Sequence, residues 1–114
     1  MRQINLLVET VAKLKLHGKT ASDILWCGSD AIGWFTWDDF SVIACTTDYD
    51  CGYGANQIPI NLVIMGKDFW LERFEYDGAE WWEFRTPIKK PEKYYKPKSL
   101  IRWELIEELE RDIA

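Results

Sequence analysis

A two-residue turn between two aromatic-rich runs is the feature that most constrains the fold of this chain. Asp77 and Gly78 separate FWLERFEY from AEWWEFRT, and an Asp-Gly pair in this setting favours a type I′ hairpin, because both turn residues need positive φ. The strands Phe69–Tyr76 and Glu80–Thr86 should then pair in a single register. Since directly opposed residues share a face, that register sorts the side chains of the hairpin onto two faces.

A second turn extends the hairpin to a three-stranded antiparallel meander. Ile60–Met65 is an apolar run that we expect to form the third strand, turned back by Gly66-Lys67 with the glycine at positive φ. This turn sets Ile64 against Phe69, Leu62 against Leu71 and Ile60 against Arg73. The pairs expected across the hairpin are Tyr76–Ala79, Glu75–Glu80, Phe74–Trp81, Arg73–Trp82, Glu72–Glu83, Leu71–Phe84, Trp70–Arg85 and Phe69–Thr86.

The two faces of this meander differ in chemistry. The first is apolar and is the expected core face, with Ile60, Leu62, Ile64, Phe69, Leu71, Trp82 and Phe84. The second is mixed, with Val63, Met65, Trp70, Phe74, Tyr76 and Trp81 interrupted by Asn61, Glu72, Glu83 and Arg85. Such a face either lies under a helix, which is the interpretation we favour, or is a binding surface.

The N-terminal segment Gln3–Leu16 has helical periodicity, and His17-Gly18 is a typical helix ending. His17 is the only histidine, and its place in the last helical turn favours a structural role. The apolar stripe of this helix should pack on one face of the sheet and consists of Ile4, Leu7, Val8, Val11 and Leu14.

Two further helices are expected. Thr36 to Asp39 matches a capping box, which predicts a helix at about residues 37–45 that buries Phe40, Ile43 and Ala44. Ser99 should cap a last helix at about residues 99–113, with an apolar stripe of Ile101, Leu105, Ile106, Leu109 and Ile113. Residues 20–35 favour two brief strands, 24–27 and 32–35, with a single helical turn at 21–26 as the alternative.

The chain therefore divides into three parts. Residues 1–86 are expected to form one α+β domain, in which the antiparallel β-meander packs against the N-terminal helix. Residues 87–98 contain three prolines and five lysines, which favour an extended basic linker. Residues 99–114 form the C-terminal helix. Nothing in the linker forces this helix back onto the domain, so it can pack on a second copy to make a homodimer.

Charge is segregated along the chain. The formal net charge is −5, yet residues 20–84 carry two basic and twelve acidic side chains, whereas residues 85–102 carry seven basic and one acidic. An acidic body disfavours a nucleic acid as the main partner and favours a protein with a basic patch. The chain also has seven tryptophans, more than a core of this size readily hides.

The sequence carries no recognisable signal for export, membrane insertion or metal binding. There is no signal peptide and no apolar run of about 20 residues, and three cysteines without CxxC spacing favour reduced thiols, so we expect a cytoplasmic protein without a membrane partner. Asp48 and Asp50, in the glycine-rich loop 48–54, resemble the start of a calcium loop, but its remaining ligands are missing. We expect a structural turn there, with no metal and no cofactor.

Glu72 and Glu83 are the one pair of facing carboxylates that the register predicts. Cross-strand carboxylates, with Cβ atoms about 5 Å apart, could serve acid–base chemistry on a glycoside or bind a divalent cation, and the aromatic residues beside them could stack a sugar. Arg85 at the diagonal offers a simpler account, an ion pair that relieves the repulsion between the two glutamates. No Ser-His-Asp or Cys-His set is indicated, so no catalytic residue is named.

The run LVIMGKDFWLERFEYDGAEWWEFRTPIKKPE resembles a family of small, acidic, uncharacterised proteins from phages and prophages of Gram-positive bacteria. The loop DYDCGYG and the turn HGKT are similar as well, so the resemblance covers about residues 1–92 and leaves the C-terminal helix outside it. It implies a bacterial host cytoplasm and a phage accessory role, and it supplies no site residues.

These patterns favour a non-enzymatic protein that binds a host or phage protein through an acidic, aromatic-rich surface. By analogy, a nucleic-acid-binding or defence protein of the host would suit the charge. The alternatives are a small-ligand or carbohydrate-binding module on the tryptophan-rich face and, less favoured, a small hydrolase. The expected binding residues are Asp38, Asp39, Asp48, Asp50, Trp70, Glu72, Phe74, Trp81, Glu83 and Arg85.

Overall fold

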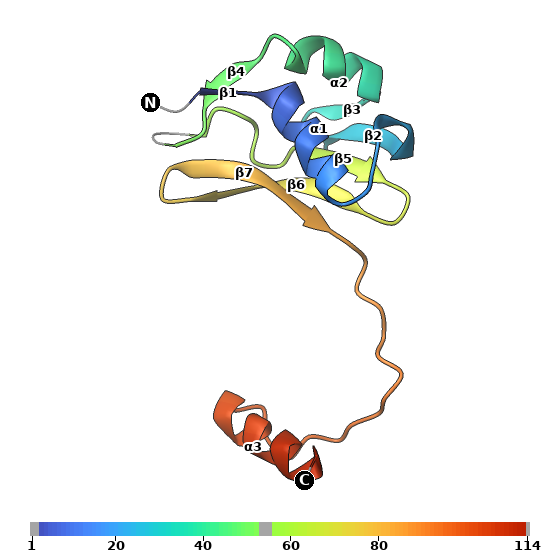
Figure 1. The fold of residues 1–114 in the computed structure, drawn as a ribbon, viewed down its shortest axis with the longest axis vertical. Coiled ribbons are helices and arrows are strands. Elements are labelled where there is room, and N and C mark those ends of the chain that lie inside the picture. Colours follow the sequence, from blue (N-terminus) through green and yellow to red (C-terminus); the bar gives the residue numbers. More distant parts are fainter. Residues whose placement is uncertain (1–2, 53–55, 114) are drawn as a thin grey trace.

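The computed structural model describes residues 3–52 and 56–113 and confirms the predicted α+β class (Figure 1). Its strands pair as a two-stranded sheet, β1-β4, and a five-stranded sheet with the order β3-β2-β5-β6-β7. The elements are β1 (Gln3–Asn5), α1 (Leu6–Leu16), the 3₁₀ turn η1 (Ala21–Asp23), β2 (Ile24–Ser29), β3 (Gly33–Phe35), α2 (Trp37–Ala44), β4 (Asp48–Asp50), β5 (Val63–Gly66), β6 (Trp70–Tyr76), β7 (Ala79–Arg85) and α3 (Arg102–Ile113).

One face of the five-stranded sheet holds the core. Helices α1 and α2 lie on the same side of the sheet in Figure 1, and β4 packs with them. The buried cluster joins all three to the sheet through Leu6, Leu14, Phe40, Ala44, Tyr49, Cys27, Ile64, Leu71 and Trp82. We call this face the core face and the opposite one the outer face.

The Asp77-Gly78 hairpin has the predicted geometry. Asp77 has a φ of 52° and Gly78 a φ of 87°, the left-handed conformation that a type I′ turn requires at both positions. Strands β6 and β7 pair in the predicted register from Tyr76–Ala79 to Trp70–Arg85. The expected pair Phe69–Thr86 lies just beyond the paired residues.

The second turn lies one residue later than predicted. Ile64 faces Leu71 instead of Phe69, and the N–H of Gly66 donates to the carbonyl of Phe69 at 2.9 Å, which leaves the two residues between them as the turn. Gly66 does not have positive φ; instead, a Cβ atom there would lie 2.2 Å from the Phe69 ring. The glycine is therefore needed for close approach. Moving the turn by one residue shifts the pairing partner of each β5 residue by two positions along β6, so each side chain keeps its predicted face.

Six of the seven residues predicted for the core face are buried or half-buried, and Ile60 is the exception. Its side chain is 63% exposed. The chain turns before β5, where the N–H of Leu62 donates to the carbonyl of Pro59, so the strand begins only at Val63. The apolar run predicted a longer strand than the structure has.

The N-terminal helix is shorter than predicted because Gln3–Asn5 forms strand β1, paired with β4. Asn5 ends the strand and caps α1. Its side-chain oxygen accepts the N–H of Val8 at 3.1 Å, and its amide nitrogen donates to the carbonyl of Cys45 and to the carboxylate of Asp48. One side chain thus satisfies the helix start and joins it to the end of α2 and the start of β4.

The face that α1 buries is rotated from the predicted stripe. Leu6, Thr10 and Leu14 are buried, whereas Val11 is 45% exposed. The hydroxyl of Thr10 donates to the carbonyl of Leu6 at 2.7 Å and accepts the indole N–H of Trp82 at 2.8 Å. Because both hydrogen-bonding roles are met, a threonine can occupy the centre of a buried face.

The structure of residues 20–44 largely agrees with what the sequence predicts. The capping box of α2 is present, with reciprocal bonds between Thr36 and Asp39 at 3.0 and 3.2 Å. Phe40 and Ala44 are buried as predicted, but Ile43 is 69% exposed, so α2 packs through a narrower row. Of the two structures left open for residues 20–35, the strands occur as β2 and β3, preceded by the short turn η1 at Ala21–Asp23. They extend the sheet to five strands, but β2 joins β5 by a crossover, so only β5, β6 and β7 form a meander.

Helix α3 lies apart from the other elements in Figure 1, and no regular structure joins it to β7. The helix begins at Arg102, later than predicted, and the hydroxyl of Ser99 accepts the N–H of Ile101 at 3.0 Å. Three predictions concern parts of the chain that the structure does not describe. These are the place of the Ile113 side chain in the apolar stripe, the end of the C-terminal helix at Ala114, and Gly54 in the loop 48–54. The division of the chain into a domain, a linker and a helix stays a prediction.

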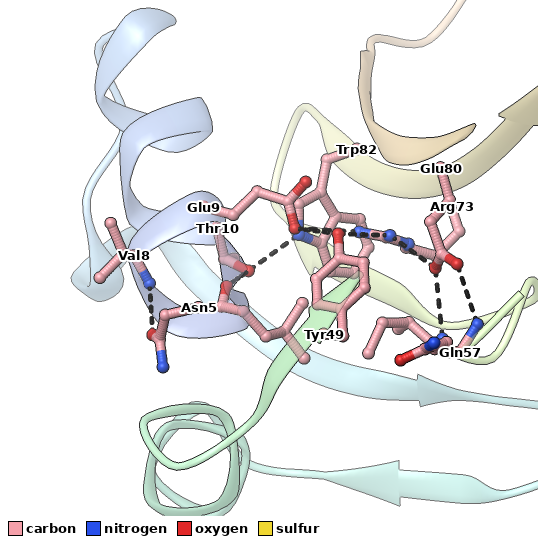
Figure 2. Close-up of polar contacts among 11 residues, drawn as sticks. Asn5, Val8, Glu9, Thr10, Tyr49, Gln57, Arg73, Glu80 and Trp82 are labelled. Atoms are coloured by element: carbon pink, nitrogen blue, oxygen red, sulfur yellow. Dashed lines mark hydrogen bonds and ion pairs between the residues drawn. The ribbon is translucent and has the colours of Figure 1, made fainter. Parts of the chain in front are cut away.

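A buried arginine joins the hairpin to the layer packed on it (Figure 2). The side chain of Arg73, 1% exposed, donates to the carboxylate of Glu80 at 3.0 Å, to the hydroxyl of Tyr49 at 2.9 Å and to the carboxylate of Glu9 at 3.4 Å. Its guanidinium carbon lies 4.7 Å from the ring centre of Trp82, the cation–π pair that the register predicted. Arg73 therefore links β6 to β7, α1 and β4.

Glu80 carries this network to the chain before β5. Its carboxylate accepts the N–H groups of Gln57 at 2.9 Å and Ile58 at 3.2 Å (Figure 2). Burial, together with the hydrogen bond donated to Glu9, holds the pKa of Tyr49 above its ordinary value. Arg73 therefore contacts α1 and β4 directly, and it contacts the chain before β5 through Glu80. Of α1, α2 and β4, only α2 contributes no described residue to the network.

Replacing Leu71 by Ala should lower the free energy of unfolding by about 2–5 kcal/mol, because a fully buried side chain is removed. Ile60→Ala is the matched control, since Ile60 is exposed, and should change the free energy by no more than about 0.5 kcal/mol. Denaturation by urea measures both. Equal losses in the two variants would contradict the assignment of the core face.

Replacing Glu80 by Gln should lower the free energy of unfolding by about 3–5 kcal/mol, because it leaves a buried guanidinium with less negative charge around it. The control is Glu75→Gln, directly opposite in the hairpin but exposed, for which a change within about 0.5 kcal/mol is expected. Chemical denaturation compares them. If Glu80→Gln lowered the free energy of unfolding no more than its control does, the network would not be essential to the stability of the fold.

Candidate functional site

The outer face is the candidate functional site, and its composition follows from the strand register. One row across the sheet runs through opposed residues Trp34, Gly28, Val63, Glu72 and Glu83. The neighbouring row is Trp26, Met65, Trp70 and Arg85. Since opposed residues share a face, the aromatic side chains of the outer face are Trp26, Trp34, Trp70, Phe74, Tyr76 and Trp81.

No helix covers the outer face within residues 3–52 and 56–113. Helices α1 and α2 pack on the core face, and α3 lies apart (Figure 1). Trp34 is 73% and Tyr76 72% exposed, while Trp26, Trp70 and Trp81 are half-buried. The favoured expectation of a covering helix is therefore wrong for the described residues, and the alternative, a binding surface, stays a prediction.

The charged groups of the outer face are held in fixed positions. Arg85 Nε donates to the carboxylate of Glu72 at 2.7 Å, the ion pair that the diagonal placement predicted. This hydrogen bond raises the pKa of the Arg85 guanidinium. The indole N–H of Trp81 donates to the carboxylate of Glu83 at 2.6 Å, and Phe74 lies against Trp81 with ring centres 5.3 Å apart. The six residues predicted on this face thus form one connected surface.

The four aspartates predicted for the same surface lie elsewhere. Asp38 and Asp39 are at the N-terminus of α2, and Asp48 and Asp50 are in β4. Both elements pack on the core face, so the sheet separates these aspartates from the outer face. The structure divides the predicted binding residues into two groups.

The segment predicted as a glycine-rich loop begins with strand β4. Asp48 accepts the side-chain N–H of Asn5 at 2.8 Å, and Asp50 accepts the backbone N–H of Gly52 at 2.9 Å. Both carboxylates therefore have structural hydrogen bonds. No group of three His, Cys, Asp or Glu side chains suited to a metal ion occurs in the part of the chain that is described.

Trp26 and Trp34 belong to the candidate site, although the sequence did not place them there. Both lie in segments predicted as brief strands, but the sequence offered no register that joined those strands to the meander. The structure inserts β2 between β3 and β5, and the pairing of Trp26 with Met65 brings these tryptophans onto the outer face. An aromatic residue in each of two neighbouring strands was the available signal.

The cysteines differ in their exposure to solvent. Burial raises the pKa of the Cys27 thiol to about 12, which disfavours the thiolate that a nucleophile needs. Cys45 is exposed at the end of α2.

No helix of the described chain is long and apolar enough to cross a membrane.

Alkylation by iodoacetamide near pH 8 should therefore modify Cys45 at least about tenfold faster than Cys27, because Cys27 is both buried and protonated. Mass spectrometry of tryptic peptides, sampled over time, measures the two rates. Denaturant is the control, since it should make the rates similar. Rapid modification of Cys27 in the folded protein would contradict the buried position.

No family model, curated protein or solved structure matches this chain. The resemblance to proteins of phages and prophages therefore stays a prediction. What the protein does has to be argued from the chemistry of its own surfaces, and above all from the outer face.

Proposed function

We propose that the protein is a non-enzymatic binding protein whose outer face docks a protein partner with a basic patch. The observation that carries this proposal is the gathering of Trp26, Trp34, Trp70 and Trp81 on one sheet face, with no covering element among the described residues. An exposed apolar patch with polar groups at its margin is typical of an interaction surface.

Aromatic residues on strands suit this role energetically. Tryptophan and tyrosine are frequent hot spots because each buries a large area while few rotatable bonds are fixed. Here the strands hold the backbone, and the hydrogen bond from Trp81 to Glu83 fixes one ring further. Little conformational entropy would therefore be lost on binding.

Charge supports a basic partner. Arg85 neutralises Glu72, whereas Glu83 has no ion pair among the described residues, so the outer face keeps a net negative charge. The segment 20–84, which includes most of the sheet, has ten more acidic than basic side chains. The electrostatic field of such a negatively charged surface accelerates association with a basic surface and is screened by salt. It also disfavours nucleic acid as the ligand.

We also propose where the protein acts and on which class of protein. The resemblance to phage and prophage proteins favours action in the cytoplasm of a bacterial host, on a host or phage protein. A host protein that itself binds nucleic acid would carry the basic patch that this account requires.

Carbohydrate is the second candidate ligand, because flat aromatic rings lie beside fixed hydrogen-bonding groups. Trp81 touches Glu83, and Trp70 is directly opposite Arg85. Apolar platforms with a few fixed polar groups are typical of small-ligand sites. Stabilisation against heat by oligosaccharides, lost when Trp70 is changed, would favour this candidate over a protein partner.

Affinity capture from a Gram-positive bacterial lysate tests the proposal, with three forms of the full chain as bait. The outer-face variant carries Trp34→Ser and Trp70→Ser. The control variant carries Val8→Ser and Val42→Ser, which change exposed apolar residues on α1 and α2. We expect one protein that wild type and control retain equally and that the outer-face variant retains at least about tenfold less, as for lost hot spots.

Two further readouts sharpen this experiment. The captured protein should carry a basic patch, and its retention should fall as salt is raised. Thermal unfolding of each bait shows whether it is folded. Equal retention by the outer-face variant, or loss only in the control variant, would contradict the proposed surface.

A further inference from the structure

A second feature of the molecule, independent of the outer face, is an apolar cavity on the core-face side. It has a volume of about 290 Å³ and lies between α1, β3, α2 and the chain before β5. Its walls are almost entirely hydrocarbon, with Leu6, Phe35 and Phe40 in the interior and the exposed Ile32 and Ile43 at the margin. A cavity of this size accommodates one large aliphatic or aromatic side chain.

The part of the chain that supplies most of the cavity walls is acidic in sequence. Residues 20–66, which include most of its walls, contain six aspartates and no lysine, arginine, histidine or glutamate. None of these aspartates forms an ion pair within the described chain. An occupant should therefore combine an apolar anchor with positive charge.

The chain itself contains a segment with this chemistry. Residues 87–98 carry five lysines and one glutamate, and no regular secondary structure occupies their backbone. Ile88 is 100% exposed and is followed directly by Lys89 and Lys90. An aliphatic side chain beside two cations matches an apolar cavity whose walls come mostly from an acidic part of the chain.

The position of this segment favours a second copy over the same chain. The segment leaves the sheet at the end of β7, whereas β3, which lines the cavity, is the opposite edge strand. Four strand spacings, about 19 Å, separate the two edges. Pro87 restricts Thr86 to extended conformations, so the chain tends to continue away from β7 rather than turn back.

We propose that the cavity of one copy binds the lysine-rich segment 87–98 of a second copy, with Ile88 as the apolar anchor. The exchange is reciprocal, because each copy offers one cavity and one segment, and two contacts close a two-fold dimer. The interaction leaves the outer face free for a different partner. It also differs from a dimer formed by pairing of α3 helices.

Sedimentation of the full-length protein across micromolar to millimolar concentrations is the first test. We expect a monomer–dimer equilibrium that shifts toward monomer as salt is raised. A monomer at all concentrations in low salt, or a dimer that salt does not affect, would overturn the proposal.

Two variants separate the cavity from the segment. The segment variant carries Lys89→Glu and Lys90→Glu, and the cavity variant carries Ile43→Lys at the exposed margin. Each alone should be monomeric, while an equimolar mixture should form a heterodimer through the one intact cavity and the one intact segment. A mixture that stays monomeric would exclude exchange between copies. A segment variant that dimerises as wild type does would point to α3 and refute the proposal.

A matched pair of substitutions tests the anchor. Ile88→Ser should weaken dimerisation by about tenfold or more, because the cavity loses its apolar occupant. Leu100→Ser removes a comparably exposed side chain beyond the segment and should change the dissociation constant less than about twofold. Circular dichroism checks that both variants are folded. Equal effects of the two substitutions would exclude Ile88 as the anchor.

Discussion

The fold depends on a buried positive charge at the centre of the hairpin. Arg73 lies under the core layer, and removing it from water is costly unless its hydrogen-bond donors are paired. Glu80, Glu9 and Tyr49 pair its two terminal nitrogens from β7, α1 and β4, while the buried Nε has no partner within the described chain. Elements distant in the sequence are thereby drawn to one point, and a register error in the hairpin would remove the charge from its partners.

This constraint also explains why the outer face remains open. A sheet has two faces, and the network commits α1 and β4 to one of them, where α2 packs in the same buried apolar cluster. The opposite face carries an ion pair, a glutamate and a set of aromatic rings, and no element of the described body is left to cover it. Its aromatic content is therefore a surface property, and we interpret it as the basis of binding.

The sequence predicted the structure well where a local rule applied and poorly where distant contacts decided. Asp77-Gly78 set the hairpin register because positive φ at two consecutive positions leaves little choice. Gly66 misled, because its role is to admit the Phe69 ring, a contact invisible in a turn pattern. Trp34 was not assigned to the site since nothing local reveals that β2 pairs with β5. The four predicted aspartates were grouped with Glu72 and Glu83 by sequence, but the sheet separates them from these two glutamates.

Solvent accessibility of the indole groups tests the central claim most directly. Relaxation of the indole N–H signals by a soluble, uncharged paramagnetic probe reports which tryptophans meet solvent. The account predicts strong relaxation for Trp34, appreciable relaxation for Trp70, and almost none for Trp82, whose N–H is bonded to Thr10. Protection of Trp34 and Trp70 equal to that of Trp82 in the monomer would show that the outer face is covered and would contradict the account.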